Sequence, residues 1–434
     1  DDIIGIQARE GNAGEITGAD FARIDGGTKS DGGKDVITIG DNNATLDLSA
    51  MAAGKISKVE GFDLAGSGSN TLVITASTVG NMGLDALAVT GTSDDTLSLL
   101  GNWTYSGDGV NGVYTLDGKS VSVSGGVKVA ITLDEPGTAE TGPDGAAVTG
   151  SSGADTITGG SGNDVINGGG GADTLRGGLG TNIIHGNEGD DTLYLDSAGD
   201  SLYGDEGNDT FILDADGSGD RTFTKDSFTL IDGGTETDTL KLNGGNNTLD
   251  LCGLGDGQVA NIDVIDITSD GNGNNAIFVD KSLFPSAGSA TVTITGNTDD
   301  SCMLIGNGWL YDASASDATC HVYANGTNTV RVSVNLCVVL QAEDSGSTLT
   351  GGRVDDVLAG GAGDDIFVLK NSDALGAITA ADFASIDGGG HTEGGMNVIM
   401  VGDNHATLDL TSLAARKISH VEGLDLAGSG SNTL

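Results

Sequence analysis

Residues 150–212 read GSSGADTIT GGSGNDVIN GGGGADTLR GGLGTNIIH GNEGDDTLY LDSAGDSLY GDEGNDTFI, a nine-residue phrase that repeats without an insertion or a deletion. Most phrases begin with glycines, and each carries Asp or Asn at its sixth position and a large apolar residue at its eighth. The apolar residues are Ile157, Ile166, Leu175, Ile184, Leu193, Leu202 and Phe211. A fixed short period of this kind predicts a solenoid.

The phrase also predicts how each turn is built. Glycine permits positive φ and close backbone approach, so the glycines form a tight turn, and the residues after it form a short strand with one inward apolar side chain. Two phrases complete one turn of a flattened, parallel, right-handed coil, so every second phrase stacks on the same edge. One predicted column holds Asp155, Asp173, Asp191 and Asp209, and the other holds Asp164, Asn182 and Asp200.

Stacked carboxylates need a cation. At a spacing of about 5 Å they repel by roughly 1 kcal/mol per pair in water, and by more near a protein surface. Calcium accepts paired carboxylates together with backbone carbonyls, so we expect several Ca²⁺ ions along the two columns. A flexible Gly/Asp-rich linker is the alternative, but a linker would not keep an apolar residue in phase. Asn182 and the degenerate phrase LDSAGDSLY weaken particular sites, which we place on the second edge.

The repeated phrase resembles the calcium-binding nonapeptide of RTX proteins, with a specific match over about a fifth of the chain. The resemblance implies a calcium β-roll in a protein that is secreted, by type I secretion in a Gram-negative bacterium. It implies metal ligands at position six of the phrases. These candidates are Asp155, Asp164, Asp173, Asp191, Asp200 and Asp209.

Shorter matches to the phrase add further candidate ligands. Residues 351–368 contain GGRVDDVLA and GGAGDDIFV, with Asp356 and Asp365 at the sixth position. The chain opens with DDII, which DDIF repeats inside the second of these phrases, so Asp1 and Asp2 resemble the tail of a nonapeptide. GGTETDTLK at 233–241 is a nonapeptide frame that lacks its third glycine, which makes Asp238 a candidate.

Composition and charge restrict the class of protein. The 434 residues include 75 glycines, 3 prolines and 4% aromatic residues, which argues against a globular enzyme with a large side-chain core and favours narrow β-solenoids. The formal charge of −45 argues against nucleic acid and anionic membranes as partners and favours cations. No apolar run approaches 18 residues, so no membrane insertion is expected. The missing initiator Met and signal peptide fit type I secretion, and equally a piece of a longer chain.

Larger modules surround the repeats. DFARIDGG…NTL at 20–72 and DFASIDGG…NTL at 382–434 share 37 of 53 positions, so they are copies, and a more divergent third copy starts at Asp226. The predicted segments are 1–19, the tail of a preceding β-roll; 20–135, the first module; 136–149, a linker with two of the prolines; 150–220, the calcium roll; 221–341, the second, cysteine-containing module; 342–370, a short roll; and 371–434, the third module.

The modules are predicted to be β throughout. Short alternating strands start the parallel coil again, and hairpin-like strands joined by DG or NG form an antiparallel cap over its open end. Trp103 and Tyr105 recur as Trp309 and Tyr311, and we expect them to form the core of the cap rather than a platform for sugar stacking. The predicted fold class is therefore all-β: right-handed parallel β-roll or β-solenoid segments that alternate with β-rich modules ending in antiparallel caps.

The cysteines all lie in the second module. Their spacing matches no zinc motif, so disulfides or buried thiols remain open, and sequence cannot choose among the three pairings. In an exported protein we expect at least one disulfide. The candidates are Cys252, Cys302, Cys320 and Cys337.

No catalytic motif stands out in the sequence: HExxH and GxSxG are absent, and the histidines are dispersed. We therefore expect no enzyme. The module copies look like those of giant RTX adhesins and surface fibres, which implies a calcium-stabilised structural or adhesive segment of an extracellular filament. Its partners would be calcium, further copies of itself or a covalent continuation, and a surface or polysaccharide ligand. The alternatives are the secretion and folding region of a secreted enzyme, or a carbohydrate-binding module.

Overall fold

The computed structural model describes most of the chain. The described residues are 2–6, 15–27, 33–39, 43–65, 68–106, 112–124, 126–213, 220–268, 273–284, 289–343, 346–351, 356–369, 377–379, 383–390, 395–401, 407–411, 413–414, 417–426 and 434. They fall into two units, Asp1–Thr210 and Phe211–Leu434, and each is described by itself. Strands dominate both units. The helical elements among the described residues are α1 (Ala76–Asn81) and the 3₁₀ turn η1 (Lys281–Leu283).

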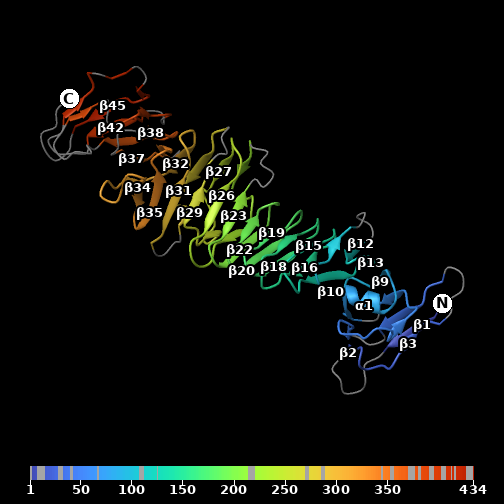
Figure 1. Cartoon of the computed structure of the whole chain (residues 1–434). Coiled ribbons are helices and arrows are strands. Elements are labelled where there is room, and N and C mark those ends of the chain that lie inside the picture. The colour runs from blue at the N-terminus through green and yellow to red at the C-terminus, as the bar shows by residue number, and fades with distance from the viewer. Residues whose placement is uncertain are drawn as a thin grey trace. The chain divides into compact units, whose positions relative to one another are not determined.

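Unit 1 is a stack of parallel strands (Figure 1). Its continuous sheet runs through β2 (Glu15–Thr17), β5 (Thr45–Asp47), β8 (Thr71–Thr75), β10 (Thr96–Leu100), β14 (Lys128–Thr132), β16 (Ala146–Thr149), β18 (Val165–Gly170), β20 (Ile183–Glu188) and β22 (Ser201–Glu206). A second sheet is β1 (Ile3–Ile6), β4 (Val36–Ile39), β7 (Gly61–Asp63), β9 (Ala86–Thr90), β13 (Lys119–Ser124), β12 (Gly112–Leu116) and β11 (Thr104–Tyr105). A third is β15 (Thr138–Glu140), β17 (Thr156–Thr158), β19 (Thr174–Arg176) and β21 (Thr192–Tyr194), and β3 (Ile24–Asp25) pairs with β6 (Ile56–Ser57).

Unit 2 repeats the arrangement. Its continuous sheet runs through β24 (Thr222–Phe223), β27 (Thr248–Asp250), β30 (Ala276–Val279), β32 (Ser301–Ile305), β36 (Cys337–Gln341), β38 (Val357–Ala359), β41 (Ser385–Asp387) and β44 (Ile418–Ser419). A second sheet includes β23 (Thr210–Leu213), β26 (Thr239–Leu242), β29 (Val264–Asp266), β31 (Thr291–Thr295), β35 (Asn328–Ser333), β34 (Cys320–Asn325) and β33 (Leu310–Tyr311). The remaining strands are β25 (Leu230–Asp232) beside β28 (Val259–Ala260), the sheet β37 (Thr348–Gly351), β39 (Ile366–Leu369), β42 (Val398–Val401) and β45 (Gly423–Asp425), and β40 (Ala377–Thr379) beside β43 (Thr407–Asp409).

The antiparallel strands differ in place from the prediction. In unit 1, β13 pairs in parallel with β9 and antiparallel with β12, so the hairpin ends one sheet of the coil while β10, β14 and β16 continue in parallel beside it. In unit 2, β35 and β34 end their sheet in the same way while β32, β36 and β38 continue. The hairpins are therefore caps on a single sheet, not on the open end of the coil. The all-β, parallel solenoid fold itself is confirmed.

The core is a set of apolar ladders. Strand residues alternate between buried and half-exposed, as the period of two in a strand requires, and the predicted apolar row from Ile157 to Phe211 is fully buried. Trp103 and Trp309 are also buried, and their indole Nε1 groups donate to the carbonyls of Leu100 and Ile305 at 3.1 and 3.0 Å. The prediction that the tryptophans form cap core is correct.

Residues 136–149 are not a linker. They contain β15, whose parallel partner is β17, and β16, which pairs with β14 and β18. Ala139 and Val148 are fully buried in these strands. The prolines misled the prediction because Pro136 and Pro143 precede the strands rather than interrupt them. The segment is one more turn of the coil, and the other predicted segment boundaries stay predictions.

The predicted disulfide is contradicted, because all four cysteines are free thiols. Cys302 and Cys337 lie on the paired strands β32 and β36, but Cys302 is opposite Val338 and Cys337 is opposite Ser301. Side chains one position apart point to opposite faces of a sheet, so Cys302 is buried while Cys337 is exposed. Cys320 lies on β34 in another sheet, and Cys252 follows β27. The shared segment of sequence does not bring the four sulfur atoms together.

Candidate calcium-binding turns

The first predicted column of acidic residues is present in unit 1. The strands β17, β19 and β21 pair in parallel with a shift of one double phrase, and each is preceded by an Asp of the column. The backbone amide of Asp155 donates to Asp173 Oδ1 at 2.8 Å, and the amide of Asp173 donates to Asp191 Oδ1 at 2.7 Å. The amide of Asp191 then donates to Asp209 Oδ1 at 2.8 Å. One carboxylate oxygen per turn thus joins each turn to the turn before it.

The second column has the same connection. The amide of Asp164 donates to Asn182 Oδ1 at 2.9 Å, and the amide of Asn182 donates to Asp200 Oδ1 at 2.9 Å. Asn182 differs from the aspartates because its Nδ2 also donates to Asp200 Oδ1, at 3.1 Å. Asn182 therefore forms a side-chain hydrogen bond with Asp200, whereas an aspartate at position 182 would repel it.

The second carboxylate oxygens of the aspartates fall into two groups, bonded and unbonded. Asp155 Oδ2 accepts from the Ser151 amide at 2.6 Å, Asp164 Oδ2 from the Gly160 amide at 3.1 Å, and Asp200 Oδ2 from the Ser197 amide at 3.1 Å. Asp173 Oδ2 and Asp191 Oδ2 are buried and have no hydrogen-bond partner. Buried polar atoms are almost always satisfied, so these two atoms indicate where a further ligand belongs.

Charge and burial conflict at these two residues. Asp173 is 2% exposed and Asp191 is 1% exposed. Burial raises the pKa of Asp173 to about 6 and that of Asp191 to about 7, with a smaller contribution from the neighbouring aspartates. Burial also raises the pKa of Asp164 and Asp200, while hydrogen bonds to backbone amides oppose the rise. Without a cation the first column therefore holds its charge at a cost in free energy.

The glycines make room for these carboxylates. A methyl group on Gly168 would lie 2.3 Å from Asp173 Oδ2 and 2.6 Å from the Gly186 carbonyl oxygen. A methyl group on Gly186 would lie 2.3 Å from Asp191 Oδ2 and 2.6 Å from the Gly204 carbonyl oxygen. At each of these glycines a carboxylate oxygen of the same turn meets a carbonyl oxygen of the next turn. A larger residue than glycine would fill the space beside these two oxygens.

The donor set fits calcium. All the possible ligand atoms are oxygens. Two carboxylate oxygens are buried without a hydrogen-bond partner, and backbone carbonyl oxygens lie near the same glycines. Hard cations such as calcium bind oxygen ligands of this kind. In the described part of the chain no three His, Cys, Asp or Glu side chains converge. A bound ion must therefore take carbonyls as well as carboxylates. Asp173 and Asp191 would hold it, and its charge would offset their repulsion and join successive turns.

The short roll brings two candidates to buried positions. Asp365 is fully buried, and both its oxygens accept from amides, Oδ1 from Ser347 at 2.7 Å and Oδ2 from Gly361 at 2.9 Å. Asp356 is also buried, and its Oδ1 accepts from the Tyr323 hydroxyl at 3.1 Å. Both residues are placed like the roll aspartates, but their carboxylate oxygens already accept hydrogen bonds from protein groups.

Asp238 and Asp2 differ from each other. Asp238 is fully buried, and a methyl group on Gly233 would lie 2.5 Å from its Oδ2 and 2.1 Å from the Asn261 carbonyl oxygen, as in the calcium roll. Asp2 is exposed, and it joins the ladder through its backbone amide, which donates to Asp35 Oδ1 at 2.7 Å. Asp2 as a metal ligand therefore stays a prediction, and Asp1 lies outside the described residues.

Asparagines of the modules, which were not predicted as site residues, also belong to the ladder. Four of them occupy the place of the roll aspartates, two residues before a buried strand residue, and are fully buried: Asn70, Asn247, Asn275 and Asn397. The triplet Asn-Thr-Leu at 70–72 and 247–249 matches Asp-Thr-Leu at 173–175 and 191–193. That triplet was a usable signal, but the modules separate the triplets by turns of unequal length.

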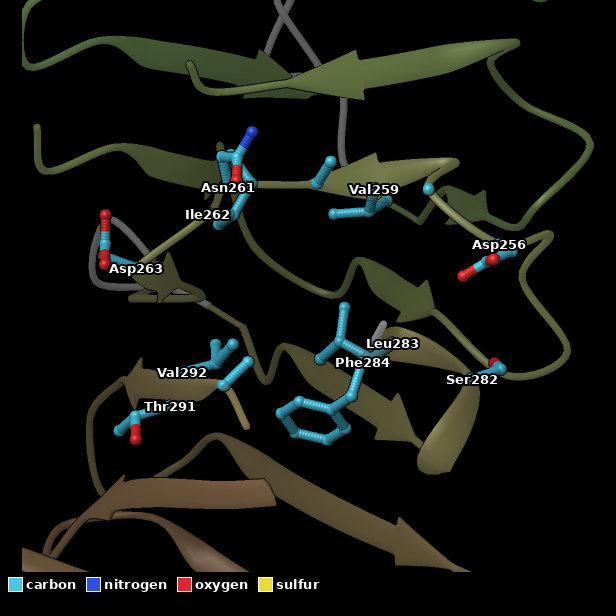
Figure 2. A pocket seen from close by; sticks show the side chains of 13 residues that line it. Asp256, Val259, Asn261, Ile262, Asp263, Ser282, Leu283, Phe284, Thr291 and Val292 are labelled. Atoms are coloured by element: carbon cyan, nitrogen blue, oxygen red, sulfur yellow. The ribbon is translucent and has the colours of Figure 1, made fainter. Parts of the chain in front are cut away.

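A cavity with a volume of about 430 Å³ lies between residues 256 and 292 of unit 2 (Figure 2). Its apolar lining includes Val259, Leu283 and Phe284, and the Phe284 ring projects into it. Figure 2 shows Asp256 and Asp263 on opposite sides, so their carboxylates do not converge on one ligand atom. The cavity is therefore a gap between turns and not a second metal centre.

Comparison with protein families matches the chain to the RTX calcium-binding nonapeptide repeat at four places, residues 149–184, 176–211, 230–251 and 344–370. Comparison with curated proteins and with solved structures gave no match. The matched ranges contain every candidate metal ligand except Asp2. RTX nonapeptide repeats bind calcium ions, as the donor set of the roll requires. The chain therefore contains RTX calcium-binding nonapeptide repeats, and two of the four matches lie in the calcium-binding β-roll at 149–211.

Proposed function

We propose that this chain is a calcium-stabilised structural and adhesive segment of a bacterial surface protein or extracellular filament. RTX calcium-binding repeats are typical of secreted proteins, so an extracellular, calcium-rich setting is the starting point. We further propose that the parallel coil serves as a stiff structural element whose turns are stabilised by calcium. Type I secretion and a Gram-negative source belong to the same proposal.

The observation that carries the proposal is the uninterrupted sheet of each unit. In unit 1 the parallel sheet from β2 to β22 passes the antiparallel hairpin without a break, and in unit 2 the sheet from β24 to β44 does the same. Module and roll are thus joined by backbone hydrogen bonds and not by flexible linkers. A chain built in this way resists bending and extension at the junctions, which suits a load-bearing fibre.

The partners proposed are calcium, neighbouring copies of the chain or a covalent continuation, and a surface or polysaccharide ligand. The formal charge of −45 favours cations and disfavours nucleic acid. In the part of the chain that the structure describes, no helix is long and apolar enough to cross a membrane. Edge strands of parallel sheets offer unpaired amides and carbonyls, so an end-to-end contact between copies would extend the existing sheets.

The alternative function is that of a folding and export region in a secreted enzyme, where the chain would lie beside a catalytic domain. We propose instead that the chain is not an enzyme. A carbohydrate-binding role at the tryptophans has little support, because Trp103 and Trp309 are buried and present no open ring face.

The proposal is tested on native material from the source cells. Electron microscopy should show filaments with a regular axial repeat that loosen in chelator and reform in millimolar calcium. Compact particles with hydrolytic activity, unaffected in shape by chelator, would contradict the structural role and favour the enzyme alternative.

A further inference from the structure

The module asparagines make the same first contact as the roll aspartates. The Ala44 amide donates to Asn70 Oδ1 at 3.0 Å, the Asn247 amide to Asn275 Oδ1 at 2.8 Å, and the Asp365 amide to Asn397 Oδ1 at 2.9 Å. These bonds match those that Asp173 and Asp191 accept in the roll. The Oδ1 position is therefore common to both residue types, and it joins each turn to the one before.

The second side-chain atom distinguishes the two residue types. Asn70 Nδ2 donates to the Leu64 carbonyl at 3.0 Å. Asn275 Nδ2 donates to the carbonyls of Gly244 and Ile267, both at 2.9 Å. In the roll, Asp173 and Asp191 hold an oxygen at this position, and that oxygen has no hydrogen-bond partner.

The surroundings of the second atom are alike in the two cases. A methyl group on Gly388 would lie 2.8 Å from Asn397 Nδ2 and 1.8 Å from the His420 carbonyl oxygen, and Nδ2 donates to that carbonyl at 3.2 Å. At Gly186 the corresponding atoms are Asp191 Oδ2 and the Gly204 carbonyl oxygen. Asparagine supplies a hydrogen between the side chain and the carbonyl. Aspartate brings two oxygens together and needs a positive charge between them.

We propose that the second side-chain atom of the residue two positions before the buried strand residue decides whether a turn takes a cation: an Asp whose Oδ2 receives no hydrogen bond, as at Asp173 and Asp191, makes a calcium turn, and Asn makes a turn that its own side-chain amide closes. The inference rests on the calcium stabilisation in the proposed function and adds which turns depend on it. The turns of Asp173 and Asp191 require calcium. The turns closed by asparagine do not: Asn70, Asn182, Asn247, Asn275 and Asn397.

A purely structural reading treats Asn and Asp as equivalent acceptors in one ladder. It accounts for Oδ1 but not for the second atom, because it leaves Asp173 Oδ2 and Asp191 Oδ2 buried without a partner. The assignment of cation turns accounts for these two atoms.

The test exchanges the two residue types in the full chain. Asp191→Asn keeps the Oδ1 acceptor and adds a donor toward the Gly204 carbonyl, whereas Asp191→Ala removes both atoms. We expect Asp191→Asn to bind fewer calcium ions than the unmodified chain by calorimetric titration. In chelator it should exchange the amide hydrogens of 173–194 about tenfold more slowly than the unmodified chain, while Asp191→Ala exchanges them faster.

The reverse exchange is made in the second module. Asn275→Asp places an oxygen against the carbonyls of Gly244 and Ile267, so amide exchange of 247–279 should accelerate in chelator and slow again in calcium. Asn275→Ala should accelerate it in both conditions. The proposal is overturned if Asp191→Asn is as fast as Asp191→Ala in chelator, or if calcium does not protect Asn275→Asp more than Asn275→Ala. If the unmodified roll gains no protection from calcium, the calcium stabilisation in the proposed function fails instead.

Discussion

The calcium roll and the modules share one backbone design and differ in how each turn is closed. In the roll, hydrogen-bonded ladder residues are 18 positions apart, and in the modules the separation is 25 between Asn275 and Asp300 and 28 between Asn247 and Asn275. In the short turns of Asp173 and Asp191 no donor reaches the second carboxylate oxygen, so a cation completes these turns. A longer turn supplies its own donors and apolar cover. In the roll, calcium therefore takes the place of the side-chain donors that the modules supply.

The roll and the modules also bury different amounts of apolar side-chain surface. The roll buries a single apolar residue per phrase, such as Leu175 or Leu193, together with a few at phrase boundaries. The modules add the hairpins, whose Trp103, Tyr114, Trp309 and Tyr323 are buried. Apolar burial contributes about 25 cal/mol per Å², so a large aromatic residue adds several kcal/mol that a roll turn lacks. The modules should therefore be stable without calcium, and the roll should be much less stable.

Calcium removal is the largest expected effect. In chelator the amide hydrogens of 155–210 should lose their protection, while those of 71–132 and 291–341 keep most of theirs, because ligand binding to the folded state alone stabilises it. Hydrogen exchange with mass spectrometry measures both regions in one sample. Equal loss of protection in modules and roll would show that calcium stabilises the modules as much as the roll.

Substitution of a first-column ligand comes next. Asp191→Ala removes a calcium ligand and leaves the buried amide of Asp173 without its acceptor, so we expect a loss of about 3 kcal/mol of unfolding free energy in calcium. Asp190→Ala is the matched control, since Asp190 lies next to it and bonds the exposed Asn208 amide. That variant should stay within about 0.5 kcal/mol. Denaturant unfolding in millimolar calcium measures both, and equal losses would argue against a special role for the column.

Substitution of glycine tests whether the ion needs the space beside the column carboxylates. Gly186→Ala would place a methyl group against Asp191 Oδ2 and the Gly204 carbonyl, and we expect a loss of about 1–3 kcal/mol with weaker calcium binding. Gly170→Ala is the control, because its nearest neighbour would lie 3.6 Å away, and it should bind calcium normally. Calorimetric titration distinguishes them. Normal binding by both variants would show that the space at Gly186 is not used by the ion.

A smaller effect is expected from pH. In calcium-free protein the raised pKa values of Asp173 and Asp191 mean that the folded roll binds more protons than the unfolded chain between about pH 4 and pH 7. Its stability should fall as the pH rises through this window. In calcium the ligands must be ionised, so stability should rise instead. Urea unfolding at both ends of the window tests the sign, and a rise with pH in calcium-free protein would be inconsistent with these two sites.

The smallest signal is the reactivity of the thiols. Cys337 is exposed and Cys302 is fully buried, and burial raises the pKa of the Cys302 thiol. A thiol reagent should label Cys337 quickly and Cys302 only when the second module opens. Rapid labelling of Cys302 in chelator would show that calcium stabilises the module as well as the roll.

The sequence alone determined the repeat, the apolar row and the two acidic columns. A nine-residue period with an apolar residue at position eight leaves few ways to bury Ile157, Leu175 and Leu193, because each strand is too short to do so without its neighbours. Stacking then follows from the backbone hydrogen bonds of parallel strands. The choice of calcium followed from the chemistry of stacked carboxylates.

Only the tertiary structure decided how the columns are satisfied. The hydrogen-bond partners of a carboxylate come from other turns, so the sequence could not show that Asp155 Oδ2 is bonded while Asp173 Oδ2 and Asp191 Oδ2 are open. Strand register, which no local pattern encodes, placed Cys302 and Cys337 on opposite faces. It also made 136–149 a turn of the coil, because pairing with neighbouring strands outweighs the local preference of two prolines and several glycines. The equivalence of Asn275 to the roll aspartates emerged in the same way, since turns of unequal length hide in sequence what parallel strands align in space.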